Sequence, residues 1–247
     1  MPEASVTAIV LQRTESGETD RRLTLLTLEL GKIDVIARGA RKGGSRLAGI
    51  SEPLVFAKMQ LAIGRHRRFV TQAQPLTSYP NLRSDYDVLT CGLAIAELAG
   101  AHVPYEAPVP EVFKALSIGL SALDAAESPV LPLVWFSARL MADEGLMPAW
   151  TVCAVTGSPV LHTPVWVSPS AGGTVEEVSA DRFRDRMRVS AEALIGIDKT
   201  ARLSEPPPKL KRAHECAAVL HRFWQGTLDA PLPAGETVVR ALASPSE

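Results

Sequence analysis

The stretch Ile33–Arg46, IDVIARGARKGGSR, joins an alternating apolar segment to a glycine-rich segment that carries four positive charges. The charges belong to Arg38, Arg41, Lys42 and Arg46, with no acidic residue among them. Because unpaired guanidinium and ammonium groups are too costly to bury in a core, we expect this segment to lie on the surface. The stretch therefore predicts a strand followed by an exposed basic loop.

The apolar part of this stretch has a period of two. Ile33, Val35 and Ala37 fall on one face of the expected strand, and Lys32, Asp34, Ile36 and Arg38 fall on the other. Similar segments occur throughout the first 80 residues and are separated by turn formers. The expected strands are Val6–Arg13, Arg22–Leu30 with a bulge at Leu25–Leu26, the segment after the Gly31-Lys32 turn, Leu54–Ile63 and Phe69–Ser78. Short strands in this order predict an OB-fold barrel, although their number alone also fits an SH3-like barrel.

The periodicity becomes helical at Pro80-Asn81. The expected helices are 80–98, 111–127, 132–145, 179–195 and 210–228. Residues 149–178 are rich in turn formers and predict a small irregular insertion, whereas the segment from Ala230 predicts a loosely held tail. The predicted fold class is α+β, with an OB-fold nucleic-acid-binding domain at 1–80 and a helical domain at 81–247.

Charge is divided unevenly between these two parts. Residues 1–80 hold 12 Lys and Arg against 7 Asp and Glu, whereas residues 81–247 hold 14 against 20. This asymmetry indicates that the first part meets a polyanion.

Cysteine usage and hydropathy indicate the compartment. Cys91, Cys153 and Cys216 are far apart in the sequence and form neither a disulfide framework nor a Cys-x-x-Cys knuckle. A reducing compartment follows. Since no apolar run approaches the roughly 18 residues of a spanning helix, and the N-terminus lacks the features of a signal peptide, we expect a cytoplasmic protein with no membrane partner.

A second basic cluster lies in the expected turn Gly64–Arg68. Together the two clusters make the candidate DNA-binding residues Arg38, Arg41, Lys42, Arg46, Arg65, Arg67 and Arg68. A solvated basic surface without a ligand is the alternative interpretation. The aromatic residues in the first 80 are Phe56, Phe69 and Tyr79, and alternation allows both phenylalanines to be buried. We therefore expect mainly electrostatic recognition with weak sequence selectivity.

Motifs for catalysis are missing from the sequence. Gly39–Ser45 has the wrong spacing for a phosphate-binding P-loop, and no Gly-x-Ser-x-Gly nucleophile motif occurs. His214 and His221 lie seven residues apart, which does not match the i,i+4 spacing of a helical zinc pair. We expect a protein that is not an enzyme and has no cofactor.

Two regions of the chain resemble the bacterial recombination mediator RecO family. The first region consists of the turn Gly17–Asp20 together with Ala37–Lys42, Ser45–Leu47 and Glu52–Leu54. The second region is Phe136–Pro148 followed by Cys153. The resemblance implies a non-catalytic protein that binds single- and double-stranded DNA and promotes strand annealing. It also implies partners, namely RecR, the single-stranded DNA-binding protein and, indirectly, RecA, which the family loads onto gapped DNA. A nucleoid-associated location follows.

The resemblance also implies a zinc-finger-like subdomain at about 149–178, and here the chain departs from the family pattern. Thr156 stands where a second cysteine belongs, and no cysteine pair follows Gly172-Gly173. Because one thiolate cannot hold a structural zinc ion, we predict a metal-free subdomain.

Two other functional classes stay open. One is an OB-fold RNA-binding or ribosome-associated module. The other is a nucleic-acid-modifying enzyme, for which Asp20, Asp34 and Glu52 are the carboxylates near the basic loops.

Overall fold

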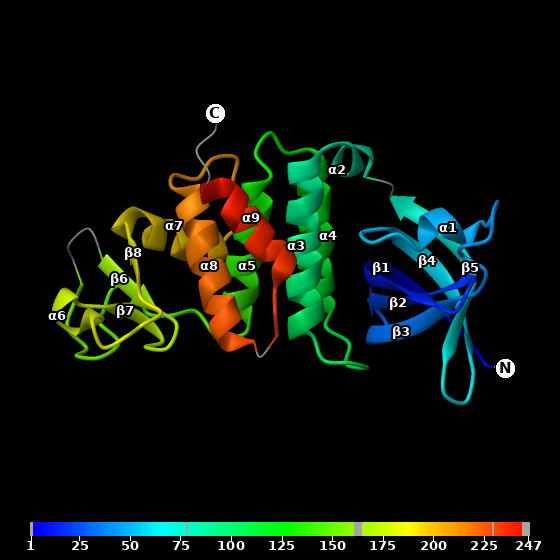
Figure 1. The fold of residues 1–247 in the computed structure, drawn as a ribbon, viewed down its shortest axis with the longest axis horizontal. Coiled ribbons are helices and arrows are strands. Elements are labelled where there is room, and N and C mark those ends of the chain that lie inside the picture. Colours follow the sequence, from blue (N-terminus) through cyan, green and yellow to red (C-terminus); the bar gives the residue numbers. More distant parts are fainter. Residues whose placement is uncertain (1, 78, 161–164, 229, 244–247) are drawn as a thin grey trace. The chain divides into compact units, whose positions relative to one another are not determined.

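The computed structural model describes residues 2–77, 79–160, 165–228 and 230–243. The chain divides into two compact units, residues 1–125 and 126–247, whose elements Figure 1 shows.

The first unit begins with a closed barrel. Its strands are β1 (Glu3–Ser16), β2 (Asp20–Thr27), β3 (Gly31–Ala37), β4 (Phe56–Ile63) and β5 (Arg68–Thr77), in the order β1-β2-β3-β5-β4. Neighbouring strands are antiparallel except β3 and β5, which run parallel and pair through Val35 with Arg68 and Ile36 with Phe69. A short helix, α1 (Leu47–Ile50), lies between β3 and β4. This arrangement confirms the predicted OB-like barrel.

The barrel core follows the predicted alternation of β3. Ile33, Val35 and Ala37 point inward and are at most 1% exposed. Lys32 lies on the outer face but is also buried, because its Nζ donates to the Gly100 carbonyl at 2.6 Å and lies over the Tyr105 ring. Burial lowers the pKa of Lys32. The outer face of β3 is therefore covered at Lys32 and becomes accessible toward Arg38.

The bulge predicted at Leu25–Leu26 is wrong. The register shifts on β1 instead, between Val10 and Gln12. Leu25 belongs to the barrel core, whereas Leu26 is fully buried outside it, opposite Ile9. Leu25 is buried inside the barrel and Leu26 on its outer side, next to strand β1, which helix α3 (Tyr86–His102) contacts, so β2 needs no change of phase.

Three helices complete the first unit: α2 (Pro80–Ser84), α3 (Tyr86–His102) and α4 (Pro110–Asp124). Asp85 interrupts the expected continuous helix, because it is extended and its side chain accepts the N–H groups of Asp87 and Val88 as the N-cap of α3. The connection between α3 and α4 returns to the barrel, where the Glu106 N–H donates to the Lys32 carbonyl at 2.9 Å. The barrel and these helices thus share one compact unit.

The second unit is built on α5 (Val130–Asp143), which packs against α7 (Ala191–Ala201) and α8 (Ala213–Thr227). Two buried tryptophans donate indole hydrogen bonds to backbone carbonyls: Trp135 of α5 donates to Leu203, and Trp224 of α8 donates to Ser137 of α5. Pro233–Ala243 forms α9 on α8, so the predicted loose tail is wrong over these residues, and 244–247 lie outside the described part. Within the described ranges, no helix combines the length and apolarity that crossing a bilayer would require.

The predicted insertion, 149–178, contributes two strands to a small sheet, and the third strand lies within 179–195, so the helix predicted for 179–195 is wrong over its first part. Strands β6 (Val165–Ser168), β7 (Gly173–Val175) and β8 (Met187–Val189) pair in the order β7-β6-β8, and α6 (Glu177–Ala180) follows β7. Residues 161–164, which fall within the insertion, lie outside the described residues.

Cys153 lies buried beside this sheet. Its sulfur accepts the Glu176 N–H at 3.4 Å. Burial raises the pKa of the Cys153 thiol, but hydrogen bonds from the Thr156 hydroxyl and neighbouring N–H groups outweigh it and lower the pKa overall. No cluster of three or more His, Cys, Asp or Glu side chains suited to a metal occurs among the described residues. The metal-free state stays a prediction.

Candidate nucleic-acid interface

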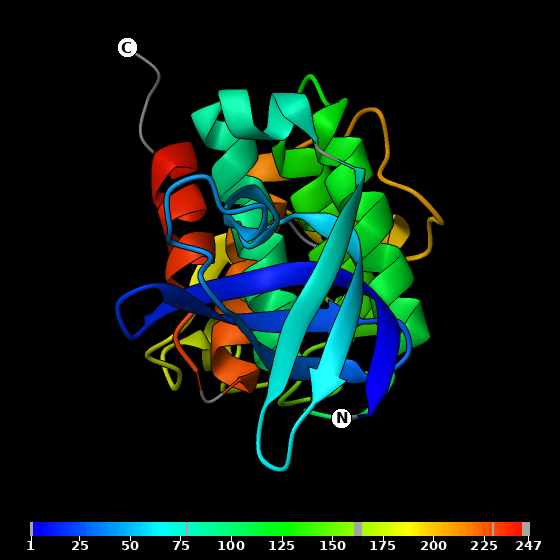
Figure 2. The same ribbon diagram turned by 90° about the vertical axis from the view of Figure 1, so that its right-hand side faces the viewer.

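The two basic clusters start side by side on the barrel and then diverge. They meet where Ile36 of β3 pairs with Phe69 of β5. From there the turn between β4 and β5 projects beyond the end of the barrel, whereas the loop after β3 runs along the barrel side to α1 (Figure 2). The seven candidate residues therefore follow an elongated track and do not form one compact cluster.

Backbone contacts to the β1–β2 turn hold the start of the basic loop. The Asp20 carboxylate accepts the Gly39 N–H at 2.8 Å, and the Arg41 N–H donates to the Thr19 carbonyl at 2.9 Å. The hydrogen bond from Gly39 holds the pKa of Asp20 below its ordinary value of 3.8. Asp20 therefore stays ionised near neutral pH and fixes the point at which the loop leaves β3.

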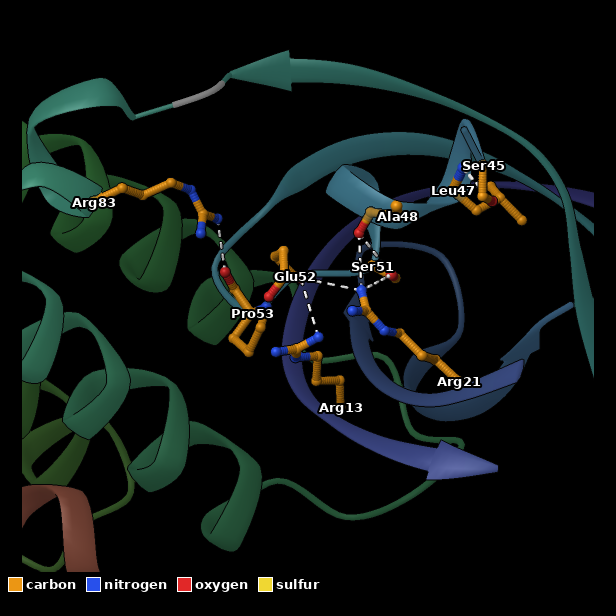
Figure 3. Close-up of polar contacts among 9 residues, drawn as sticks. All are labelled: Arg13, Arg21, Ser45, Leu47, Ala48, Ser51, Glu52, Pro53 and Arg83. Carbon is orange, nitrogen blue, oxygen red and sulfur yellow. Dashed lines mark hydrogen bonds and ion pairs between the residues drawn. The ribbon is translucent and has the colours of Figure 1, made fainter. Parts of the chain in front are cut away.

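Arg21 clamps the other end of the loop from inside (Figure 3). Its Nη1 lies 2.9 Å from the Ala48 carbonyl, 2.6 Å from Ser51 Oγ and 3.0 Å from Glu52 Oε1. Arg13 pairs with the same Glu52 oxygen at 3.0 Å. These contacts place α1 and the following turn on the ends of β1 and β2. Local sequence contains no signal for them, since the partners are between 27 and 39 residues apart.

Two of the seven candidate residues are paired with carboxylates. Arg41 Nη1 lies 3.2 Å from Glu15, and Arg68 Nη2 lies 2.7 Å from Glu106. Glu15 and Glu106 are themselves well exposed, so both pairs are accessible to solvent. A phosphate would have to compete with these carboxylates for the two arginines.

Four other candidates are unengaged. Lys42, Arg46, Arg65 and Arg67 are exposed, and among the described residues none of them has an ion pair or a side-chain hydrogen bond. The seventh candidate, Arg38, is exposed and lies over the Phe69 ring, with 3.9 Å between its Cζ and the ring centroid. The track therefore presents five cations without an ion pair, of which Arg38 and Lys42 are close enough to Asp20 to help lower its pKa.

A shallow hollow of about 220 Å³ lies where the turn between β4 and β5 meets the outer face of β3. Its basic lining residues are Arg22, His66, Arg67 and Arg68. Arg22 lies 2.5 Å from Asp34 of β3, and this ion pair raises the pKa of Arg22. The local sequence interpretation missed Arg22, and it included His66 in the second basic cluster without making it a candidate DNA-binding residue. The side-chain alternation of β2, which puts Leu23 inside, would have placed Arg22 on this face.

The carboxylates considered for an enzyme are all engaged structurally. Asp20 caps the loop at Gly39, Asp34 accepts from Arg22 and the Thr24 hydroxyl, and Glu52 accepts from Arg21. Their arrangement fits the positioning of cations and backbone. The site as a whole is suited to binding a phosphate chain along a barrel face, which is the ligand face common to OB-folds.

Two family models match the chain. The family model described as "Recombination protein O N terminal" matches residues 1–79, and "Recombination protein O C terminal" matches residues 83–233. The two models meet close to the end of β5, whereas the division into compact units falls after residue 125.

Curated relatives named "DNA repair protein RecO" align with much of the chain. One from Dehalococcoides mccartyi is 34% identical over 168 residues, covering 68% of this chain and 66% of the relative, just under two thirds of its length. One from Roseiflexus sp. is 35% identical over 190 residues, covering 76% and 67%. One from Anaeromyxobacter dehalogenans is 32% identical over 225 residues, covering 87% and 89%. By both family models and these relatives, the chain belongs to the recombination protein O (RecO) family.

Proposed function

We propose that this chain is a DNA-repair protein that binds single- and double-stranded DNA through the basic track of its barrel. The observation that carries the proposal is the set of exposed cations without carboxylate partners at Arg38, Lys42, Arg46, Arg65 and Arg67. Each such cation that approaches a phosphate releases counterions, so an elongated track contributes affinity without base-specific contacts. Membership of the RecO family and the relatives' name support the same role.

We further propose that the role is that of a mediator without catalysis. In this role the protein acts with RecR and with the single-stranded DNA-binding protein, helps to load RecA onto gapped DNA, and promotes annealing of complementary strands. The engagement of Asp20, Asp34 and Glu52 in structural contacts supports a binding function over hydrolysis. A role in DNA repair implies a cytoplasmic location at the nucleoid.

A salt titration of DNA binding tests the first part of the proposal. The variant with Lys42, Arg46, Arg65 and Arg67 all replaced by Ala is expected to bind oligonucleotides more weakly, and to lower the slope of log affinity against log salt by about 3 for single strands. A matched control replaces the exposed cations Lys58, Lys114, Arg184 and Lys199, and is expected to keep most of the affinity. An unchanged slope in the first variant, or equal losses in both, would show that the track is not the DNA site.

The mediator role needs a second substrate. The wild-type protein is expected to bind oligonucleotides already coated with single-stranded DNA-binding protein and to accelerate annealing of coated complementary strands. Binding to bare but not to coated DNA would contradict this role. Stronger competition by structured RNA than by single-stranded DNA would favour an RNA-binding module instead, and cleavage of a labelled strand with magnesium would favour an enzyme.

A further inference from the structure

We propose that Arg38, held against Phe69, forms a stacking surface for one unpaired base of single-stranded DNA. The inference rests on the proposed DNA-binding function and deepens it, because it adds a base-contacting step to a track that otherwise meets phosphates. It also gives the site a means of distinguishing an unpaired strand from a duplex.

The geometry of the pair is the first observation. Arg38 follows β3 directly, and Phe69 lies at the start of β5, opposite Ile36. The guanidinium carbon lies 3.9 Å from the ring centroid, which is the separation of a cation in contact with the ring face. Phe69 is half-buried and outside the barrel core, because the inward position on β5 belongs to Val70. The ring thus supports Arg38 from below and does not fill the core.

The contacts of Arg38 differ from those of the barrel arginines that are paired with carboxylates. Arg21, Arg22, Arg41 and Arg68 each direct N–H groups at a carboxylate. Within the described residues the exposed Arg38 side chain has no ion pair and no hydrogen bond; it lies on the ring, and its charge helps to lower the pKa of Asp20. An arginine that is oriented but has free donors is prepared for a ligand.

The surroundings match the parts of one nucleotide. Ile36 lies half-buried beside Phe69 and extends the apolar support. The hollow that begins at Ile36 is lined by Arg67, which has no ion pair, and by Arg22 and Arg68, which are paired with carboxylates, so Arg67 is the cation it offers to a phosphate. Guanidinium planes and aromatic rings both stack on unpaired nucleobases. In a duplex each base is already stacked between neighbours, so a free strand is the ligand that can use this surface.

The experiment compares three probes: an oligo-dT strand, the same-length strand with abasic sites in place of the bases, and a duplex. Arg38→Lys keeps the charge and removes the planar face, and Phe69→Leu keeps an apolar side chain and removes the ring. Arg184→Lys, at an exposed arginine outside the track, is the matched control for the first variant.

Wild-type protein is expected to bind oligo-dT more tightly than the abasic strand. Arg38→Lys and Phe69→Leu are each expected to weaken binding of oligo-dT by about fivefold or more, the lower end of the effect of one stacked base. Both are expected to change binding of the abasic strand and the duplex by less than about twofold, and to leave the salt slope unchanged, since no charge is lost. Arg184→Lys is expected to change none of these affinities.

Equal weakening for oligo-dT and the abasic strand would overturn the stacking surface, because it would assign Arg38 to phosphate contact or Phe69 to stability. No effect of either variant on oligo-dT would overturn it as well. The quadruple alanine variant of the track separates this failure from that of the proposed function. If that variant loses affinity while Arg38→Lys does not, only the stacking surface is refuted.

Discussion

Removing the Arg21 clamp should loosen the basic loop without unfolding the barrel. In Arg21→Ala the Ala48 carbonyl, Ser51 hydroxyl and Glu52 carboxylate lose a shared donor, Nη1. A guanidinium nitrogen carries two hydrogens, so the three acceptors represent about two full hydrogen bonds.

The magnitude follows from the burial of this group. One bond reaches a neutral acceptor and contributes about 1 kcal/mol. The other reaches Glu52, whose side chain is 32% exposed, so solvent screening reduces its contribution to about 1 kcal/mol as well. Local opening of α1 and the following turn should therefore become easier by about 2 kcal/mol, or about 30-fold in the opening equilibrium.

Amide hydrogen exchange of peptides covering residues 47–55 measures this opening directly. The Ser51 N–H, which donates to the Leu47 carbonyl at 3.0 Å, is one of the amides expected to exchange about 30-fold faster. Arg22→Ala is the matched control, since Arg22 is the neighbouring residue, has a 58% exposed side chain and contacts Asp34 instead of the loop. Exchange within about twofold of wild type in Arg21→Ala, or equal acceleration in Arg22→Ala, would refute the clamp. Protection of β4 amides reports whether the barrel stays folded.

Three further predictions concern stability and metal. Gly31→Ala should destabilise the first unit by about 2 kcal/mol or more, because its Cβ would lie 2.0 Å from the backbone oxygen of Ala107. Gly17→Ala is the control: Gly17 has a similar positive φ but open space around it, so the substitution should cost about 1 kcal/mol. Thermal unfolding compares the two variants, and equal losses of stability would contradict the close contact at Gly31. Burial raises the pKa of Cys91 and of Cys216 to about 12 against an ordinary 9.0, so both thiols ionise first in the unfolded chain. The contribution of the two neutral thiols to stability is fully present below about pH 9 and is lost as pH rises toward about 12. In urea unfolding, each of the two compact units should lose about 1 kcal/mol of unfolding free energy between about pH 9 and about pH 10. Cys91→Ala should remove this loss in the first compact unit. Purified protein should contain far less than one equivalent of zinc, and a chelator should leave the unfolding temperature unchanged, because Cys153 has no partner cysteine in the sequence; one tightly bound equivalent would contradict this.

Local periodicity was sufficient to predict the barrel. The alternation through Ile33, Val35 and Ala37 requires a strand with one buried face, and the turn formers between such segments define a small antiparallel barrel. It failed where a helix from later in the chain covers a strand's outer face. Lys32 looks exposed in the sequence, but it is buried and donates to the Gly100 carbonyl, 68 residues away. Leu26 looks out of phase, but it is buried opposite Ile9 of β1, the strand that α3 contacts.

The candidate site shows the same division. Composition indicated the basic track, since clustered cations must face solvent. It could not separate Arg41 and Arg68, which are paired with Glu15 and Glu106, from cations without a partner, because those carboxylates lie far away in the sequence. The outward position of Phe69 could have been predicted from the sequence, because its neighbour Val70 points into the barrel and side chains alternate along a strand.

The contact between β3 and β5 gives the barrel a mechanical weak point. Over the described residues this ladder contains two residue pairs, whereas β3 pairs with β2 along its whole length. The barrel wall therefore has few hydrogen bonds along this seam, the β3–β5 ladder, and separation of these two strands breaks few of them. A strand of DNA held by Arg38 on one side of the seam and by Arg67 on the other would bridge it, so binding would tighten the closure of the barrel.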